Sequence, residues 1–160
     1  MLVGDIMQRD LTALSEDTGL LEAVSIMELH GTSGLPVVND AGRVAGFVSE
    51  KDILRAIIPG YLGYMDENFL MPAAVKIRAK VKRVEYDEVR EYMTKNCLVL
   101  DEDETVLNAL VALFRKDVKC APVVRDGMFV GMVDREAILR GFFRENSEDP
   151  EPDILVRTAK

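Results

Sequence analysis

The 160-residue sequence contains few of the residues on which most enzyme chemistry depends. It has one histidine and two cysteines, and neither cysteine belongs to a CxxC pair or to a metal-ligand spacing. Because it also lacks a nucleophile motif and a cluster of metal ligands, the sequence predicts a protein that is not an enzyme and has no catalytic metal or cofactor. Cys97 and Cys120 are interpreted as reduced thiols of a cytoplasmic protein.

Long hydrophobic runs and an excess of basic residues are also missing. No apolar segment approaches the roughly 20 residues that span a membrane, and residues 1–5 lack the basic and apolar regions of a signal peptide. Lys and Arg number 20 against 28 Asp and Glu, which gives a formal net charge of −8. Because an acidic chain repels phosphate backbones at long range, nucleic-acid binding is not expected.

The sequence does contain an internal repeat. At an offset of 86 residues Met7 matches Met93, and residues 36–38 match residues 122–124. One residue is then lost in a turn, and the matches continue at an offset of 85. Leu14 with Leu100 and Ala23 with Ala109 match at the offset of 86, and Gly42 with Gly127 and Gly46 with Gly131 match at the offset of 85. A single gap that falls in a turn indicates two copies of one structural unit.

Each copy has the hydrophobic pattern of a β-α-β-β-α unit. In the first copy a short strand is predicted around Leu14, a helix over 20–29, strands over 35–38 and 44–48, and a helix from about Glu50. The second copy repeats this order, with strands over 121–124 and 128–133 and a helix from about Arg135. Asp17-Thr18 and Asp103-Glu104 are predicted to provide the N-cap and first-turn acid of the first helix in each copy.

The predicted fold class is α/β, with two β-α-β-β-α repeats packed sheet to sheet, because one copy of about 50 residues is too small for a secure core. The predicted boundaries are 1–58 for the first repeat and 89–144 for the second. Residues 59–88 are predicted to form a mostly helical linker, with a helix over 66–86. Residues 145–160 form an acidic, proline-containing tail that is expected to be mobile.

This pattern resembles the CBS-domain family, named after cystathionine β-synthase, in its paired form, the Bateman module. The residues that carry the resemblance are 33–38, Gly42 and 46–54 in the first copy, and 121–124, Gly127 and 131–133 in the second. The resemblance covers about residues 3–143. It implies two copies related by a pseudo-twofold axis, binding of adenosine-containing ligands in the clefts between them, and dimerisation into a disc of four repeats.

Ser49 and Asp52 have two compatible interpretations at the start of the second helix. The first is a capping box, in which Ser49 is the N-cap and Asp52 reaches back to it. The second is ligand binding, because a helix N-terminus suits a phosphate and a carboxylate one turn further on accepts hydrogen bonds from ribose hydroxyls. The family pattern Gly-apolar-apolar-Ser/Thr-x-x-Asp assigns these ligand roles to Ser49 and Asp52.

The second copy departs from that pattern. Asp134 and Ala137 stand where the first copy has Ser49 and Asp52. Asp134 suits a helix N-cap but would repel a phosphate, and Ala137 has no acceptor for a ribose. The sequence therefore predicts one nucleotide site per chain, built on Asp52.

The resemblance implies that the adenine lies against the opposite repeat. The complete set of predicted nucleotide-binding residues is Ser33, Gly46, Val48, Ser49, Lys51, Asp52, Leu98, Val99, Val118, Lys119, Cys120, Ala121 and Pro122. For Val118, Ala121 and Pro122 an ordinary core-strand role stays open, and Lys119 is either a phosphate contact or an exposed lysine. Ala13 and Val99 replace a threonine that is common in the family, which puts a side-chain contact there in doubt.

The function predicted from these residues is a regulatory module that senses an adenine nucleotide (AMP, ADP or ATP) in the cleft between the repeats. Its expected partners are a second copy of the chain, in a homodimer, and an effector protein that the sequence does not identify. The alternatives are a ligand-free interaction scaffold of the same fold, or a sensor of S-adenosylmethionine or NAD.

Overall fold

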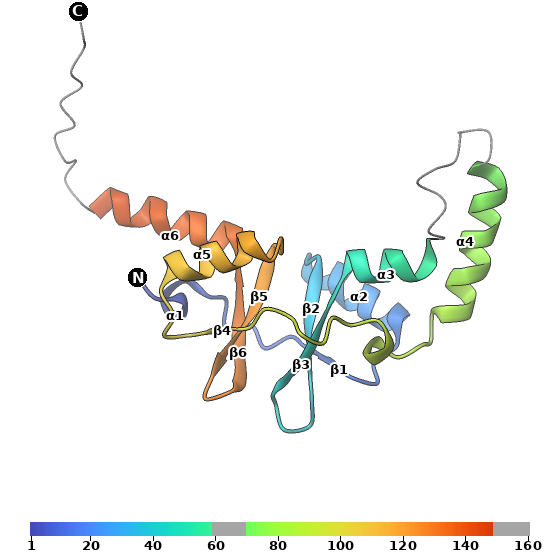
Figure 1. Ribbon diagram of the computed structural model, residues 1–160, viewed down its shortest axis with the longest axis horizontal. Helices are drawn as coiled ribbons and strands as arrows, with labels where there is room; N and C mark the ends of the chain where they lie inside the picture. The colour runs from blue at the N-terminus through green and yellow to red at the C-terminus, as the bar shows by residue number, and fades with distance from the viewer. Residues whose placement is uncertain (59–69, 149–160) are drawn as a thin grey trace, which may run out of the picture.

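The computed structural model describes residues 1–58 and 70–148, and it confirms the α/β fold with two β-α-β-β-α copies (Figure 1). The first copy consists of β1 (Leu14–Ser15), α2 (Leu20–His30), β2 (Gly34–Val38), β3 (Val44–Ser49) and α3 (Glu50–Ile57). The second consists of β4 (Leu100–Asp101), α5 (Val106–Arg115), β5 (Cys120–Arg125), β6 (Met128–Asp134) and α6 (Arg135–Glu148).

Three further elements open and join the copies. The short helices α1 (Val3–Ile6) and η3 (Val89–Glu91) precede the first and second copy, and α4 (Leu70–Val84) forms most of the predicted linker helix. The predicted start of that helix at 66–69 and the acidic tail from 149 onwards lie outside the described residues.

The two sheets have the same topology and register. Each has three strands, in the orders β1-β2-β3 and β4-β5-β6, with one parallel and one antiparallel pairing. Leu14 lies opposite Val37 and Leu100 opposite Val123, so the pairs match at the offset of 86 residues. The two copies that match in sequence therefore also pair their strands in the same register.

The missing residue of the second copy lies in its hairpin turn, as predicted. Asp126 and Gly127 have φ angles of 51° and 77°. Two successive residues with positive φ are typical of a tight two-residue hairpin. The first copy has a longer turn, in which the Asn39 N–H donates to the Arg43 carbonyl at 2.9 Å and Gly42 has a φ of 75°.

The predicted caps of the first helix in each copy are wrong. The N-cap of α2 is Gly19, without a side-chain cap, and the N-cap of α5 is Thr105, whose Oγ1 accepts from the Asn108 N–H at 3.3 Å. The physical reason is that the preceding residues close the turn after the first strand. The Thr18 hydroxyl, for example, accepts from the Ser15 N–H at 3.0 Å.

Each hydrophobic core includes the opening segment of the other copy. Val3 and Met7 are buried in the second core, with Leu100 and Val123 among their neighbours. In the same way Val89 is buried in the first core. The two copies therefore share their cores and do not pack as finished units.

The main chain reinforces this exchange between copies. Gln8 and Met132 exchange two backbone hydrogen bonds, at 2.8 and 2.9 Å, which join the first copy's opening segment to β6. Phe47 and Thr94 do the same at 3.0 and 2.9 Å, which joins the second copy's opening segment to β3. Residues 8–13 and 94–99 thus cross from one sheet to the other.

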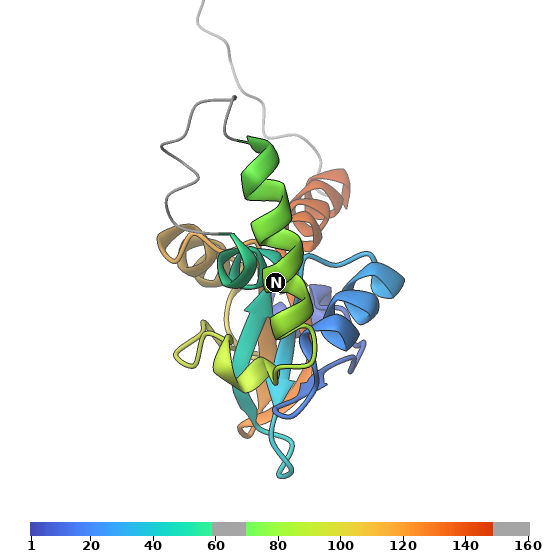
Figure 2. The same ribbon diagram turned by 90° about the vertical axis from the view of Figure 1, so that its right-hand side faces the viewer.

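Helices cover one side of the paired sheets. In Figure 1, β2 and β5 lie side by side at the centre, and both hairpin turns point to the lower edge of the view. Helices α2, α3, α5 and α6 lie along the upper side, and we call their outer surface the helix layer. Helix α4 stands at the first-repeat end and rises beyond the helix layer in both views (Figures 1 and 2).

Candidate functional site

Ser49 and Asp52 form the predicted capping box at the start of α3. One carboxylate oxygen of Asp52, Oδ2, accepts from the Ser49 N–H at 2.8 Å and from the Ser49 hydroxyl at 2.9 Å. The Asp52 N–H donates to the Ser49 hydroxyl oxygen at 3.3 Å. Both side chains are partly buried, so they are held in place but still reach solvent.

The second oxygen of Asp52 takes no part in the cap. Among the described residues, no donor is hydrogen-bonded to Oδ1 of this carboxylate. The carboxylate can therefore cap the helix with one oxygen and accept a ribose hydroxyl with the other. The positive end of the α3 dipole and the exposed ammonium group of Lys51 favour an anionic group nearby, whereas the carboxylates of Glu50 and Asp52 in the same turn oppose it.

The structure brings Ser33 to the same point. Its carbonyl accepts the Glu50 N–H at 2.9 Å, and the next residue, Gly34, lies opposite Ser49 in the sheet register. Gly46 and Val48 are placed differently. Gly46 is buried where a Cβ would lie 2.7 Å from the Met93 sulfur, and Val48 is fully buried in the first core.

At the matching helix start of the second copy, Asp134 caps α6 with its own side chain. Asp134 Oδ1 accepts from the Ala137 N–H at 2.6 Å, so Asp134 caps α6 as predicted. Its other oxygen accepts from the Gln8 side chain at 3.5 Å. Ala137 is 3% exposed and packs in the second core. This helix start therefore presents no carboxylate in the position that Asp52 occupies in the first copy.

The predicted residues of β5 divide between its two faces. Ala121 is buried in the second core with Val123, so Cys120 and Pro122 point to the opposite face by the alternation of a strand. That alternation matters because β5 lies against β2 of the first copy. Cys120 is partly buried and is consequently better placed than Ala121 to contact a ligand between the sheets, whereas Pro122 is itself buried.

The other predicted residues of the second copy are also divided. Leu98 and Val118 are partly buried and pack against the second core. The side chains of Val99 and Lys119 are exposed, and the Lys119 carbonyl accepts the Arg135 N–H at 3.1 Å, as Ser33 does for Glu50. Lys119 is thus a cation at the same end of the strands as Ser33.

Cys120 is a poor nucleophile in this position. Burial raises the pKa of its thiol to about 11, and the Asp134 carboxylate acts in the same direction. Because the thiolate is the reactive form, Cys120 is expected to pack as a small apolar side chain.

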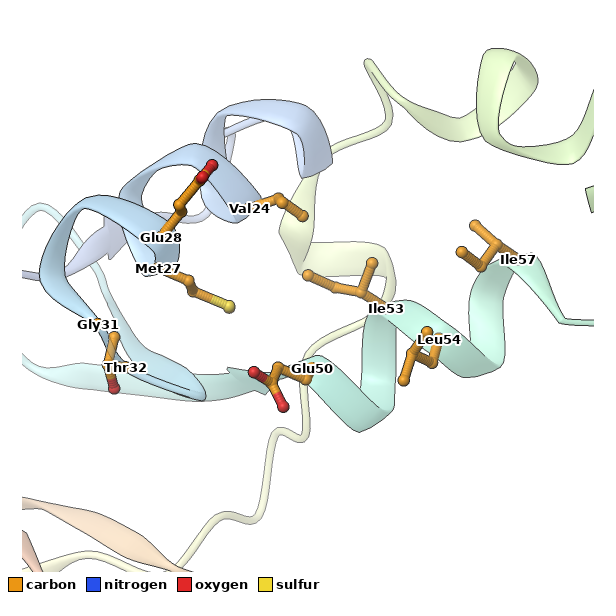
Figure 3. Close-up of a pocket in the computed structure, with 9 residues that line it drawn as sticks. All are labelled: Val24, Met27, Glu28, Gly31, Thr32, Glu50, Ile53, Leu54 and Ile57. Atoms are coloured by element: carbon orange, nitrogen blue, oxygen red, sulfur yellow. The ribbon is translucent and has the colours of Figure 1, made fainter. Parts of the chain in front are cut away.

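Sequence reasoning missed a hollow between α2 and α3 (Figure 3). It has a volume of about 610 Å³ and lies in the first repeat alone. Met27 of α2 and Ile53 of α3 point toward each other across it, and Glu28 and Glu50 come from the two facing helices. Neither Ser49 nor Asp52 lines this hollow. Its signal in the sequence is the pair of apolar residues on the outer faces of these helices, Val24 and Leu54, which are 42% and 48% exposed.

No helix in the described part of the chain is long and apolar enough to cross a membrane. The described residues also include no group of three or more His, Cys, Asp and Glu side chains that could hold a metal ion.

Comparison with known proteins gives matches along both copies. A family model of the CBS domain matches residues 3–59 and 89–144. An uncharacterized protein of Methanocaldococcus jannaschii is 29% identical over an alignment of 150 residues that covers 84% of this chain and 87% of that relative. The chain spans only 39% and 26% of two further relatives from that organism, the second of which is an inosine-5'-monophosphate dehydrogenase.

Solved structures have the same fold at lower identity. A crystal structure of CBSX2 in complex with AMP superposes with a TM-score of 0.69, at 22% identity, over 91% of this chain and 98% of that chain. A CBS domain pair in complex with 5'-methylthioadenosine and S-adenosyl-L-methionine gives 0.64, at 24% identity, with the same coverage of 91% and 98%.

Proposed function

The chain belongs to the CBS-domain family, and from this premise we propose that it is a non-catalytic regulatory module of the cytoplasm that binds an adenine nucleotide between its two repeats. The observation that carries the proposal is the Asp52 carboxylate, which caps α3 through one oxygen and leaves the other for a ribose. Two solved relatives of the same fold were crystallised with adenosine compounds, AMP in one and S-adenosylmethionine with methylthioadenosine in the other.

Within that ligand class, a phosphate-bearing nucleotide suits the site better than S-adenosylmethionine. The start of α3 offers the positive end of a helix dipole and a hydroxyl at Ser49. Lys51 and Lys119 add exposed ammonium groups. A sulfonium and an ammonium group would meet these cations unfavourably, whereas phosphate oxygens would accept hydrogen bonds from them.

We propose one such site per chain, because Asp134 and Ala137 replace the serine and the aspartate in the second repeat. Ligand binding would then regulate an effector protein by favouring one of two arrangements of the repeats.

The same proposal includes a homodimer. The helix layer exposes large apolar side chains in both repeats, which is unusual for a surface that faces water alone. They are Leu21, Val24, Leu54, Leu107, Phe114 and Leu139, each at least 42% exposed. A ligand-free scaffold would use the same surface, so nucleotide binding is what separates the two functions.

Isothermal titration with AMP, ADP and ATP tests the nucleotide site. We expect one site per chain, and loss of binding in Asp52→Ala. Asp134→Ala is the matched control, because it removes the equivalent cap from the second repeat and should keep the nucleotide site. Two equal sites per chain, or unchanged affinity in Asp52→Ala, would contradict the proposal. Absence of any thermal stabilisation by these nucleotides would favour the scaffold.

A further inference from the structure

We propose that the helix layer docks on the helix layer of a second copy head to tail, so that the first repeat of one copy meets the second repeat of the other. The inference rests on the dimer of the proposed function and adds its orientation. A closed twofold dimer through this surface has two possible arrangements, head to tail or repeat on like repeat, and their contacts differ.

The first observation is that the two repeats present opposite chemistry at matched positions. The repeat offsets align Glu28 with Phe114 and Glu50 with Arg135. In the first repeat the two carboxylates line the apolar hollow between α2 and α3 (Figure 3). In the second repeat the Arg135 guanidinium lies 4.7 Å from the centre of the Phe114 ring. One repeat thus has an acidic hollow where the other has a cation stacked on an aromatic ring.

Within the described part of one chain, Phe114 stays largely exposed and the Arg135 guanidinium has no close carboxylate partner. The Phe114 side chain is 62% exposed. The Nε of Arg135 is buried and has no hydrogen-bond partner in the described structure. Its ion pair with Asp117 is long, at 3.8 Å, and that aspartate is 90% exposed. An acidic, partly apolar surface from another molecule would cover the exposed Phe114 ring and give the exposed part of the Arg135 guanidinium a closer carboxylate.

Head-to-tail docking brings these two surfaces together twice. The ring of Phe114 would meet the apolar hollow of the partner, and Arg135 would meet the carboxylates of Glu28 and Glu50. Docking of like repeats would instead place each acidic hollow against the acidic hollow of the other chain, and each Arg135 against Arg135 of the other chain. Like charges at an interface suppress the wrong arrangement, so charge selects the orientation.

The second observation is the charge at the two ends of the molecule. Helix α4 carries five Lys and Arg residues and no acidic residue between 70 and 84. Residues 145–148, at the end of α6, carry two acidic residues and no basic one. Helix α4 and the end of α6 lie at opposite ends of the long axis (Figure 1).

The position of α4 makes this difference relevant to docking. Because α4 rises beyond the helix layer (Figures 1 and 2), a copy stacked on that layer lies beside it. Head to tail, the basic helix would lie near the acidic end of the partner. In the other arrangement the two basic helices would lie at the same end of the dimer, which their like charges oppose. Both observations point to the same orientation.

Charge reversal with sedimentation equilibrium tests the contact. Head to tail, Arg135→Glu places a third carboxylate among Glu28 and Glu50 of the partner, and we expect the dimer dissociation constant to rise by about tenfold or more. The compensated variant E28R/E50R/R135E should regain most of the affinity. The control Lys95→Glu makes the same charge change at an exposed residue of the segment 94–99, which crosses between the sheets. It should leave the dimer dissociation constant unchanged. An R135E dimer as tight as the wild type would overturn the inference.

Spin-label distances test the orientation without altering the charged contact. With both native cysteines replaced by alanine, labels are placed at Lys82→Cys in α4 and Glu145→Cys in α6. We expect the distance between positions 82 and 145 of different chains to be shorter than the distance between the two positions 82. The reverse order overturns the orientation and leaves the dimer intact. A monomer at all concentrations refutes the dimer itself, whereas nucleotide stoichiometry is measured independently of both.

Discussion

At the start of α3, the helix cap and the proposed ligand site use the same two side chains but different oxygens of Asp52. Asp52 makes both bonds to Ser49 through Oδ2, so the capping box is complete before any ligand arrives. A ligand hydroxyl that reaches Oδ1 therefore does not have to break the cap. This arrangement pre-forms the site, which lowers the ordering cost of binding.

Two matched substitutions separate the structural role of Ser49 from its ligand role. Ser49→Ala and Thr105→Ala each remove a hydroxyl that accepts a cap bond at 3.3 Å. Each should therefore lower the free energy of unfolding by about 1 kcal/mol in urea titrations. Only Ser49→Ala should also weaken nucleotide binding, because Thr105 lies at the α5 start. Equal nucleotide affinity in both variants would mean that Ser49 is a cap and nothing more.

The reactivity of Cys120 gives a pH prediction. Since its folded pKa is raised to about 11 from an ordinary 9.0, the neutral thiol persists until the pH approaches the raised value. At pH 8 the thiolate fraction should be about a hundredfold below that of an ordinary thiol, and alkylation should slow accordingly. Mass spectrometry of iodoacetamide-treated protein measures this rate, with the urea-unfolded chain as the control. Rapid alkylation of the folded protein at pH 8 would contradict the placement of Cys120.

At the scale of elements, the crossovers explain why glycine stands at matched places in β3 and β6. A Cβ on Gly131 would lie 2.4 Å from the Gln8 carbonyl oxygen, and one on Gly46 would lie 2.7 Å from the Met93 sulfur. Both glycines thus let the opening segment of the opposite repeat approach the sheet. The neighbours differ in kind, since Gly131 faces backbone and Gly46 faces mainly a flexible side chain.

The glycine pair predicts unequal costs for the same substitution. Gly131→Ala has to displace the Gln8 backbone and strain its two bonds to Met132, so we expect a loss of about 1–3 kcal/mol in the free energy of unfolding. Gly46→Ala should cost less, because the Met93 side chain can rotate away. Urea denaturation of the two variants gives the comparison. A larger loss for Gly46→Ala would contradict this account of the crossovers.

Local patterns and long-range packing differed in how well the sequence predicted them. The strands, the turn that lost a residue and the second helices were correct, because apolar runs, a one-residue gap in the repeat and an S-x-x-D cap depend on residues close together in the sequence. The caps at Gly19 and Thr105 were missed because Thr18 and Asp101 bond the turn that precedes each helix. The exchange of Val3 and Val89 between cores was missed because hydrophobic periodicity does not identify a partner.

The candidate site was predictable to the same extent. The Ser49–Asp52 pair and its loss in the second repeat could be seen in the sequence, since both depend on residue types at fixed spacing. The faces of β5 could not, because Ala121 and Pro122 are equally apolar in composition and only the sheet register separates them. The hollow between α2 and α3 depends on how two helices pack, so it appeared only in the structure.

For the whole molecule, the exchange of opening segments predicts that the two repeats unfold as one cooperative unit. Val3 completes the second core and Val89 the first, and both side chains are 0% exposed. The backbone bonds of Gln8 and Thr94 tie each segment to the opposite sheet as well. A ligand that moves one repeat would therefore change the core of the other, which gives a physical route from nucleotide binding to the helix layer.

This coupling can be tested with a substitution in one repeat that is measured in the other. Val3→Ala removes two buried methyl groups from the second core and should cost about 2 kcal/mol. Because each opening segment completes the core of the opposite repeat, we expect the slowest-exchanging amides of β1–β3 and of β4–β6 to lose protection equally in hydrogen-exchange mass spectrometry. Val75→Ala, at a residue that is 69% exposed, is the control and should change neither sheet. Loss of protection in β4–β6 alone would mean that the repeats unfold separately, and that a signal from Asp52 to the helix layer has to travel by another route.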